Sequence, residues 1–342
     1  MNQRLEKIQK EKQKKVIRFF YLVLIAFVSF SCTIKNNVIK SNYTIQNAEY
    51  FILKEEYNKA LKFYKKAYSN NKFWTANNCF TAAQVAAVLD DEVFFLKTIK
   101  SGMDKGLEPV FFYNDTILND YIKSNNLGLK IEKRFIKSKD KYNSNINKSL
   151  NDSIIKLSQL DNKWKIHYLD SLANIDSLNK DKYSKKYDSI VKDIVDNHLV
   201  KLIKIHGYPY FNVLLEQNGN SYGNNRAKLI LLHYYSMPKS CDFNDLLKNE
   251  VFKGNLPAEQ FAEIMDFQAK YGSEEFCKVG FYNEWHIHND SLMNDEINRR
   301  RKEIGLREYN EKIKKFERGK QICREIRLRK IYKHIRLFYW CG

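Results

Sequence analysis

The sequence predicts an all-α protein. Its 342 residues include only 4 prolines and 12 glycines, while 44% of the residues are hydrophobic. Few turn-forming residues and ample packing material favour helices over a turn-rich β-sandwich. Apolar residues also recur at three- and four-residue steps along much of the chain, which is the period of an amphipathic helix. A chain of this length exceeds one ordinary core, so we expect two helical domains.

The first element is predicted to be an export signal over residues 1–31. Seven lysines and arginines and only two glutamates accompany the apolar run from Phe19 to Phe30. A helix rising about 1.5 Å per residue over this run falls short of a hydrocarbon core of about 30 Å. A cationic segment followed by a short apolar one is instead typical of a signal peptide.

The end of this signal, Ser29-Phe30-Ser31-Cys32, resembles a bacterial lipoprotein signal of the relaxed kind that is common in Bacteroidetes-like bacteria, and the Lys-, Asn- and Ile-rich usage resembles that of an AT-rich genome. The resemblance implies that the Cys32 sulfur carries a diacylglycerol. It also implies a lipoprotein anchored to a membrane of the cell envelope, on the periplasmic face or at the cell surface. Residues 32–42 would then be a short tether. An uncleaved signal anchor and a cytosolic chain are the alternatives.

Residues 43–135 are predicted to form helical hairpins. One face of the segment NAEYFILKEEYNKALKFYKKAYSNN carries Tyr57, Ala60, Tyr64 and Ala67. The segment resembles the second helix of a tetratricopeptide repeat and the turn before it. The resemblance implies a concave surface that binds a partner protein or peptide, and we assign Tyr57, Tyr64 and Trp74 to partner binding.

A second helix pair is predicted over FWTANNCFTAAQVAAVLDDEVFFLKTIKSGMDKGLEP, with Asp90 and Asp91 at its turn. It resembles a degenerate repeat of the same family. Further helical material up to residue 135 is expected to close the open end of the stack. Residues 136–150 are polar and poor in apolar groups, so we predict a linker there.

Residues 151–316 are predicted to form a second, mainly helical domain. Glycines and prolines divide it into helices. The first helical stretch ends at Gly207, and the next helix covers RAKLILLHYYSM. Two more lie between Asp242 and Gly254 and between Pro257 and Gly272, and a last one runs from Asp290 or Ser291 through residue 316.

Four segments of this domain, LIKIHGYP, LILLHYY, EIMDFQAKYG and NRRRKEIGLREY, resemble in order and spacing an uncharacterised bacterial domain family of unknown activity. The matched residues are Gly207, Pro209, His233, Asp266 and the arginines before Gly305 and Leu306. The resemblance implies a helical fold, and it makes His233 and Asp266 the candidate catalytic residues. The alternative for His233 is a buried histidine with one hydrogen-bond partner.

Other residue patterns predict no metal site and no cofactor. His286 and His288 in WHIH would share one side of an extended strand, but no third metal ligand is indicated nearby. No phosphate-binding Gly-Lys-Ser/Thr and no G-x-S-x-G is present. The six cysteines are scattered without a C-x-x-C and indicate no disulfide scaffold, and Cys79 has the pattern of a small core residue.

The net charge of +19 lies mainly at the two ends of the chain. Residues 299–342 hold 16 basic and 5 acidic side chains, whereas the body is near neutral. The charge is therefore no argument for nucleic-acid binding. In the basic tail, residues 317–342, isoleucines recur beside arginines and lysines. This tail would lie on an anionic membrane surface as a helix, or form a poorly packed extension.

Together these features predict a membrane-tethered interaction protein, a scaffold or adaptor of the cell envelope. Its partners would be a protein or peptide at the helical repeats and a lipid bilayer at Cys32. The alternative is an enzyme of unknown class with a site around His233 and Asp266.

Overall fold

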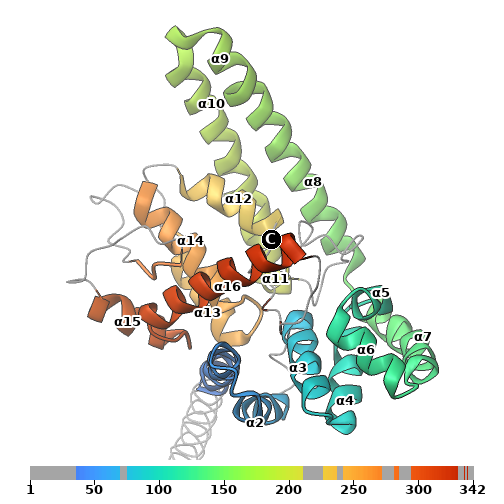
Figure 1. Cartoon of the computed structure of the whole chain (residues 1–342). Helices are drawn as coiled ribbons and strands as arrows, with labels where there is room; N and C mark the ends of the chain where they lie inside the picture. The colour runs from blue at the N-terminus through green and yellow to red at the C-terminus, as the bar shows by residue number, and fades with distance from the viewer. Residues whose placement is uncertain are drawn as a thin grey trace, which may run out of the picture.

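The computed structural model describes residues 36–69, 75–210, 226–236, 242–271, 281–284 and 294–329, together with Ile335 and Leu337. Within these ranges the chain is helical and contains no β-strand, which confirms the predicted all-α class (Figure 1). The predicted signal over residues 1–31, the lipidation site Cys32 and the partner-binding candidate Trp74 lie outside the described residues. None of the helices in these ranges combines the length and the apolarity that a membrane span needs.

The N-terminal part begins with four helices: residues 36–53, α2 (Tyr57–Tyr68), α3 (Ala76–Val88) and α4 (Glu92–Met103). The turns between the first two and the last two are tight, because Glu55 and Asp90 adopt left-handed φ angles of 59° and 53°. The Asp91 carboxylate then caps α4 by accepting the Phe94 N–H at 2.9 Å. Local turn and cap chemistry therefore places α2, α3 and α4 where the sequence predicts them. The tether predicted over residues 32–42 is wrong from residue 36 on, because residues 36–42 belong to the first helix and bury Val38.

Three further helices follow: α5 (Pro109–Tyr113), α6 (Thr116–Ser124) and α7 (Gly128–Asn145). The linker predicted over residues 136–150 is wrong, because this segment is the second half of α7 and the start of α8 (Lys148–Lys165). Its few apolar groups suffice for packing, since Tyr142, Ile146 and Leu150 are all buried. Asn147 caps α8 by accepting the Leu150 N–H at 2.9 Å.

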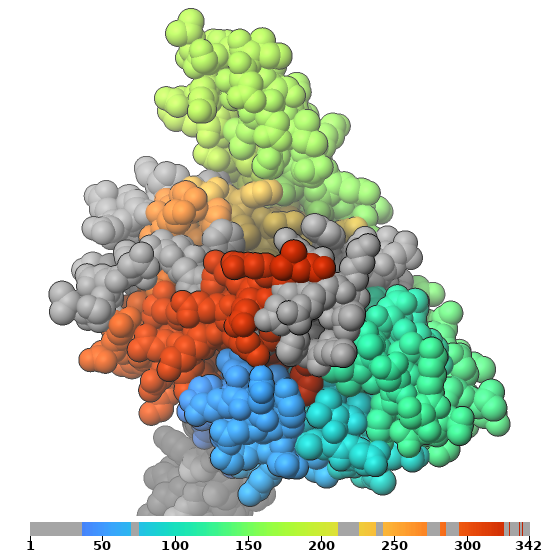
Figure 2. All heavy atoms as spheres, in the orientation of Figure 1, coloured from blue at the N-terminus to red at the C-terminus, as the bar shows by residue number. Residues whose placement is uncertain are grey.

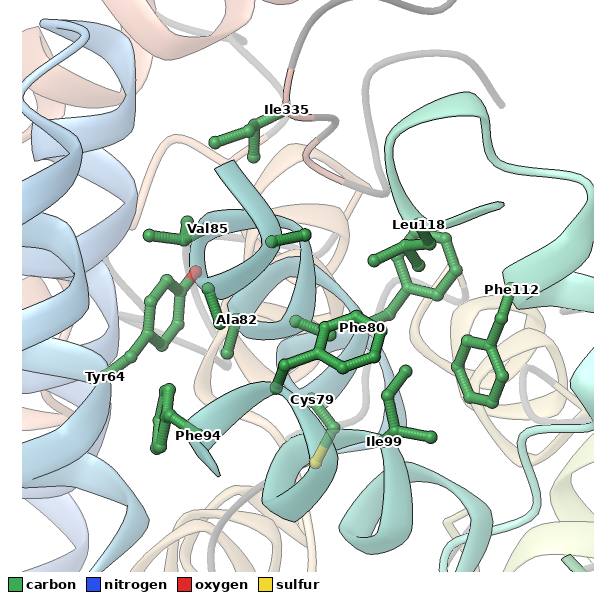
Figure 3. Packing of buried hydrophobic residues seen from close by; sticks show 14 of the residues in the cluster. Tyr64, Cys79, Phe80, Ala82, Val85, Phe94, Ile99, Phe112, Leu118 and Ile335 are labelled. Atoms are coloured by element: carbon green, nitrogen blue, oxygen red, sulfur yellow. The ribbon is translucent and has the colours of Figure 1, made fainter. Parts of the chain in front are cut away.

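The N-terminal helices enclose one hydrophobic core centred on α3 (Figure 3). Tyr64 points from α2 toward α3 and is fully buried. Cys79 is a free, buried thiol, as its pattern predicted. The core also takes in residues from the far end of the chain, namely Ile322, Cys323, Ile335 and Leu337.

A long hairpin projects from the rest of the molecule (Figure 1). One arm is α8, which continues as η2 (Ile166–Leu172) and α9 (Ala173–Ile175), and the tip contains η3 (Ser177–Asn179). The other arm is α10 (Lys180–Asp193), η4 (Ile194–Leu199) and α11 (Val200–His206). Gly207 ends α11 with a φ of 80°, as its sequence position predicts.

The C-terminal part adds α12 (Arg226–Tyr235), α13 (Asn244–Lys253), α14 (Ala258–Tyr271), α15 (Asn294–Glu303) and α16 (Tyr309–Arg329). The single helix predicted from Asp290 or Ser291 through residue 316 is wrong, because the chain breaks at Gly305 with a φ of 83°. A β-carbon on Gly305 would lie 2.7 Å from the Ile39 carbonyl oxygen. The break therefore lets the first described helix pack against this turn.

A second hydrophobic core lies among α8, α10–α14 and the turn after α15. Helix α16 joins the two parts: its surface adjoins that of the N-terminal helices in Figure 2. Residues expected on the apolar face of a free basic tail, Ile322 and Ile335, are each 3% exposed within the N-terminal core. These two side chains are therefore not available to a membrane surface. Cys323 beside them is disulfide-bonded, although the sequence indicated no disulfide scaffold.

Candidate functional site

The two catalytic candidates do not share partners. His233, on α12, places Nδ1 2.8 Å from an Asp161 carboxylate oxygen, and the Tyr187 hydroxyl donates to the other oxygen at 2.7 Å. Asp161 is buried and the His233 ring is partly exposed. His233 thus ties α12 to α8 in the second core, which fits the alternative of a histidine held by one hydrogen-bond partner.

Asp266, on α14, is completely buried and supports a chain segment. Its carboxylate accepts the backbone N–H groups of Tyr282, Asn283 and Glu284. Burial raises the pKa of Asp266 to about 6, although these three donors favour the charged form. Asp266 therefore fixes the backbone that carries Glu284.

Glu284 is the centre of a buried ion-pair network. The Arg301 guanidinium donates to Glu284 Oε1 and to the Tyr282 carbonyl, both at 2.8 Å, and to the Arg307 carbonyl at 2.6 Å. The ammonium group of Lys312 pairs with Glu284 Oε2. Burial alone would raise the pKa of Glu284, but the charges of Lys312 and Arg301 outweigh it and lower the pKa to about 2. Glu284 is therefore held ionised.

Glu284 faces a pocket of about 220 Å³ between the two parts of the molecule. One wall is formed by residues 36–53 and the start of α3, and the other by the α13–α14 turn and α16. Uncharged donors and acceptors come from Asn42, Gln46, Thr75, Asn77, Asn78 and Thr81. Apolar lining comes from Val38, Ile45, Tyr210, Val251, Leu256 and Pro257.

The charged lining consists of Glu49, Glu259, Glu263, Glu284, Lys312 and Lys315. Three of the carboxylates have cationic partners: Glu49 pairs with Lys315, Glu263 with Lys228 at 2.7 Å, and Glu284 with Lys312 and Arg301. The Lys315–Glu49 pair joins segments 266 residues apart in the sequence. The pocket is thus built by the contact between the two helical parts.

Glu259 differs from the other three glutamates. It accepts a hydrogen bond from the Gln46 side-chain amide. Burial raises the pKa of Glu259, and the charges of Glu284 and Glu49 raise it further, while Lys315 acts in the opposite direction. A partly desolvated carboxyl group in a preformed polar pocket is a typical feature of a ligand-binding site. Within the described ranges, no group of three or more histidine, cysteine or acidic residues has the arrangement of a metal site.

The predicted partner-binding tyrosines lie away from this pocket. Tyr64 was assigned to partner binding, but that assignment is wrong because its whole side chain is buried between α2 and α3. Tyr57 is half-buried and packs against the same core. The pocket residues were missed because the charges that meet there come from four distant segments, and no local pattern marks that encounter.

A scan against protein-family models and searches of curated proteins and solved structures found no match to this chain. The tetratricopeptide, lipoprotein and bacterial-domain resemblances therefore rest on the quoted residues alone and stay predictions.

Proposed function

We propose that this chain is a tethered binding protein of the cell envelope, and that its binding site is the pocket between the two helical parts. The observation that carries the proposal is the pocket lining, in which buried ion pairs hold charged groups in place around about 220 Å³ of space. Groups that are already ordered lose little conformational entropy on binding, which favours recognition of a small ligand or of a partner's side chain.

The proposed localisation rests on the N-terminal sequence and on the disulfide-bonded Cys323. The short apolar run before Cys32 supports export and attachment of lipid to the Cys32 sulfur. The disulfide at Cys323 supports an oxidising compartment, where structural disulfides persist. Labelled palmitate should be incorporated into the wild-type protein and not into Cys32→Ser. Equal labelling of both, or none of either, would reject the lipid anchor.

The binding site is tested by filling the pocket. Asn77 lines it from α3 and is exposed, so Asn77→Trp adds bulk at the mouth without displacing a buried group. Asn143→Trp is the matched control, because Asn143 is an exposed helix residue of α7 away from the pocket lining. Ligand-observed NMR with a library of small polar fragments should give signals with the wild type and the control that Asn77→Trp loses. A library in which no fragment distinguishes wild type from Asn77→Trp would refute the proposed site.

The proposal retains the scaffold or adaptor role but moves the partner-binding surface from the helical repeats to the pocket. A protein partner would present a side chain to the pocket, since Tyr64 has no exposed surface for it. The enzyme hypothesis has less support, because His233 and Asp266 bind Asp161 and the 282–284 backbone respectively.

A further inference from the structure

Carboxylates outnumber ammonium groups in the pocket lining, with four glutamates and two lysines. Both lysines are already committed to ion pairs, Lys312 with Glu284 and Lys315 with Glu49. Glu263 has Lys228. Among the described residues, Glu259 is the one lining carboxylate with no cation within ion-pair distance, and its hydrogen-bond partner is the neutral amide of Gln46.

The surroundings of Glu259 favour a positive charge beside it. Glu49 faces it from residues 36–53, Glu263 follows one turn later on α14, and Glu284 faces it from the 281–284 segment. Burial is the largest cause of the raised pKa of Glu259; the charges of Glu284 and Glu49 raise it further, and the charge of Lys315 opposes them. Among the described lining carboxylates, Glu259 is the one that can pair with an entering cation without breaking an existing ion pair.

The rest of the pocket fits a cation on an aliphatic stem. Val38, Ile45 and Leu256 give apolar lining next to the charged wall. The volume of about 220 Å³ far exceeds the about 15 Å³ that a single water requires. An anionic ligand would have to displace Glu284 or Glu49 from a lysine, and it would then lie among the remaining carboxylates.

We propose that the pocket binds a primary amine on a short aliphatic chain, with the ammonium group at Glu259 and the methylenes against the apolar wall. This inference rests on the proposed binding function and names its ligand class. The amine belongs either to a small molecule or to a lysine side chain of a protein partner, because both present the same group.

The test is a matched series of ligands titrated into the full-length protein by NMR and calorimetry: pentylamine, pentanol and pentanoate. We expect pentylamine to bind with a Kd of about 1 mM, a modest affinity typical of a ligand of this size. Pentanol and pentanoate should bind about tenfold more weakly or not at all. Glu259→Gln should weaken pentylamine about tenfold or more, because it removes the charge partner of the ammonium group.

Glu317→Gln is the matched control, since Glu317 is exposed on α16 and does not line the pocket. It should leave pentylamine binding unchanged. Nα-acetyl-lysine methylamide separates the two sources: tighter binding than pentylamine identifies a protein side chain, and weaker binding identifies a small molecule.

Three results would overturn the amine proposal: pentanol binding as well as pentylamine, pentanoate binding more tightly, or Glu259→Gln binding pentylamine like the wild type. If these ligands bind the wild type but give no binding signal with Asn77→Trp, the proposed binding site stands and only its ligand class is wrong. If no member of the series binds, the amine proposal fails, and the fragment library decides independently whether the pocket binds anything.

Discussion

Replacing Arg301 by methionine tests whether the buried network holds the pocket wall. Arg301 and Glu284 each expose only 1% of their side chains. The substitution keeps much of the apolar stem, but it removes the fork that binds Glu284 and the carbonyl groups of Tyr282 and Arg307. It therefore leaves two carbonyl acceptors without this donor and a buried carboxylate with Lys312 as its remaining cationic partner.

Two estimates give a similar loss of stability for Arg301→Met. Removing one partner of a buried ion pair typically destabilises a protein by about 3–5 kcal/mol. Independently, the surroundings lower the pKa of Glu284 from 4.5 to about 2, which corresponds to about 3 kcal/mol of net stabilisation of its charged form. Lys312 supplies part of this interaction and remains, but the lost carbonyl hydrogen bonds add to the effect. We expect a loss of about 3–4 kcal/mol.

Urea unfolding followed by circular dichroism measures the loss, with Arg301→Lys as the charge-preserving comparison. Lysine keeps the positive charge without the planar fork, so its destabilisation should be intermediate. In the double variant Arg301→Met with Glu284→Gln, the carboxylate is neutral, and the combined loss should fall short of the sum of the single losses by about 1–3 kcal/mol. A loss below about 1 kcal/mol for Arg301→Met, or strict additivity in the cycle, would refute the role assigned to this pair.

The pH dependence of stability gives a separate measure of the same pair. The folded-state pKa of Glu284, about 2, lies below its unfolded value of 4.5. Its stabilising contribution is therefore complete above pH 4.5 and is lost as the pH falls toward 2. In Glu284→Gln this acid-side loss should be absent, and an unchanged pH profile in that variant would contradict the lowered pKa.

Three further predictions concern other buried groups. The pKa of Asp266 is about 6 in the folded protein and 3.8 in the unfolded chain, so the folded protein should lose about 3 kcal/mol of stability as the pH rises from 3.8 to 6. A pKa below 4 for this carboxyl group, measured by ¹³C NMR, would contradict the prediction. Burial raises the pKa of Cys79 to about 11, so iodoacetamide at about pH 8 should label Cys79 in urea and not in the native protein; fast native labelling would disprove this. Ile322→Ala should destabilise the N-terminal core by about 2–5 kcal/mol, seen as faster hydrogen exchange in α3, and unchanged exchange there would exclude the packing of α16 on that core.

Features encoded by a few neighbouring residues were predictable from the sequence. Asp91 caps α4, and Gly207 and Gly254 end α11 and α13 with positive φ angles. Each depends on a side chain and a backbone geometry within one helical turn, so a single sequence contains the needed information. The break at Gly305 was missed because its reason is the Ile39 carbonyl, which approaches from the other end of the chain.

The wrong linker prediction has a related cause. Average composition over residues 136–150 is polar, but packing depends on single side chains. The ring of Tyr142 lies so close to Gly106 that a β-carbon there would be 2.6 Å from it, which anchors α7 to the turn after α4. One buried tyrosine at the right place therefore holds this segment in a helix, although its composition is typical of a linker.

The pocket shows the limit of local patterns most clearly. Gln46 reaches Glu259 across 213 positions, and Lys315 reaches Glu49 across 266. In the sequence each of these residues is one of many charged or polar groups on a helix face, where solvent exposure is the expected state. The packing of α14 and α16 against the first described helix brings them together, so their chemistry follows from the tertiary contact.

Three of the residues that carry the bacterial-domain resemblance have a common role in this geometry. Asp266 fixes the backbone of residues 282–284, Arg301 neutralises Glu284, and Gly305 admits the first described helix beside α16. All three act on the position of one pocket wall, and none of them lines the pocket itself. A substitution at Asp266 or Arg301 should therefore change ligand affinity through the position of Glu284, whereas a substitution at Glu259 should change it by direct contact. Glu259→Gln should weaken amine binding with little loss of stability, while Arg301→Met should weaken both together.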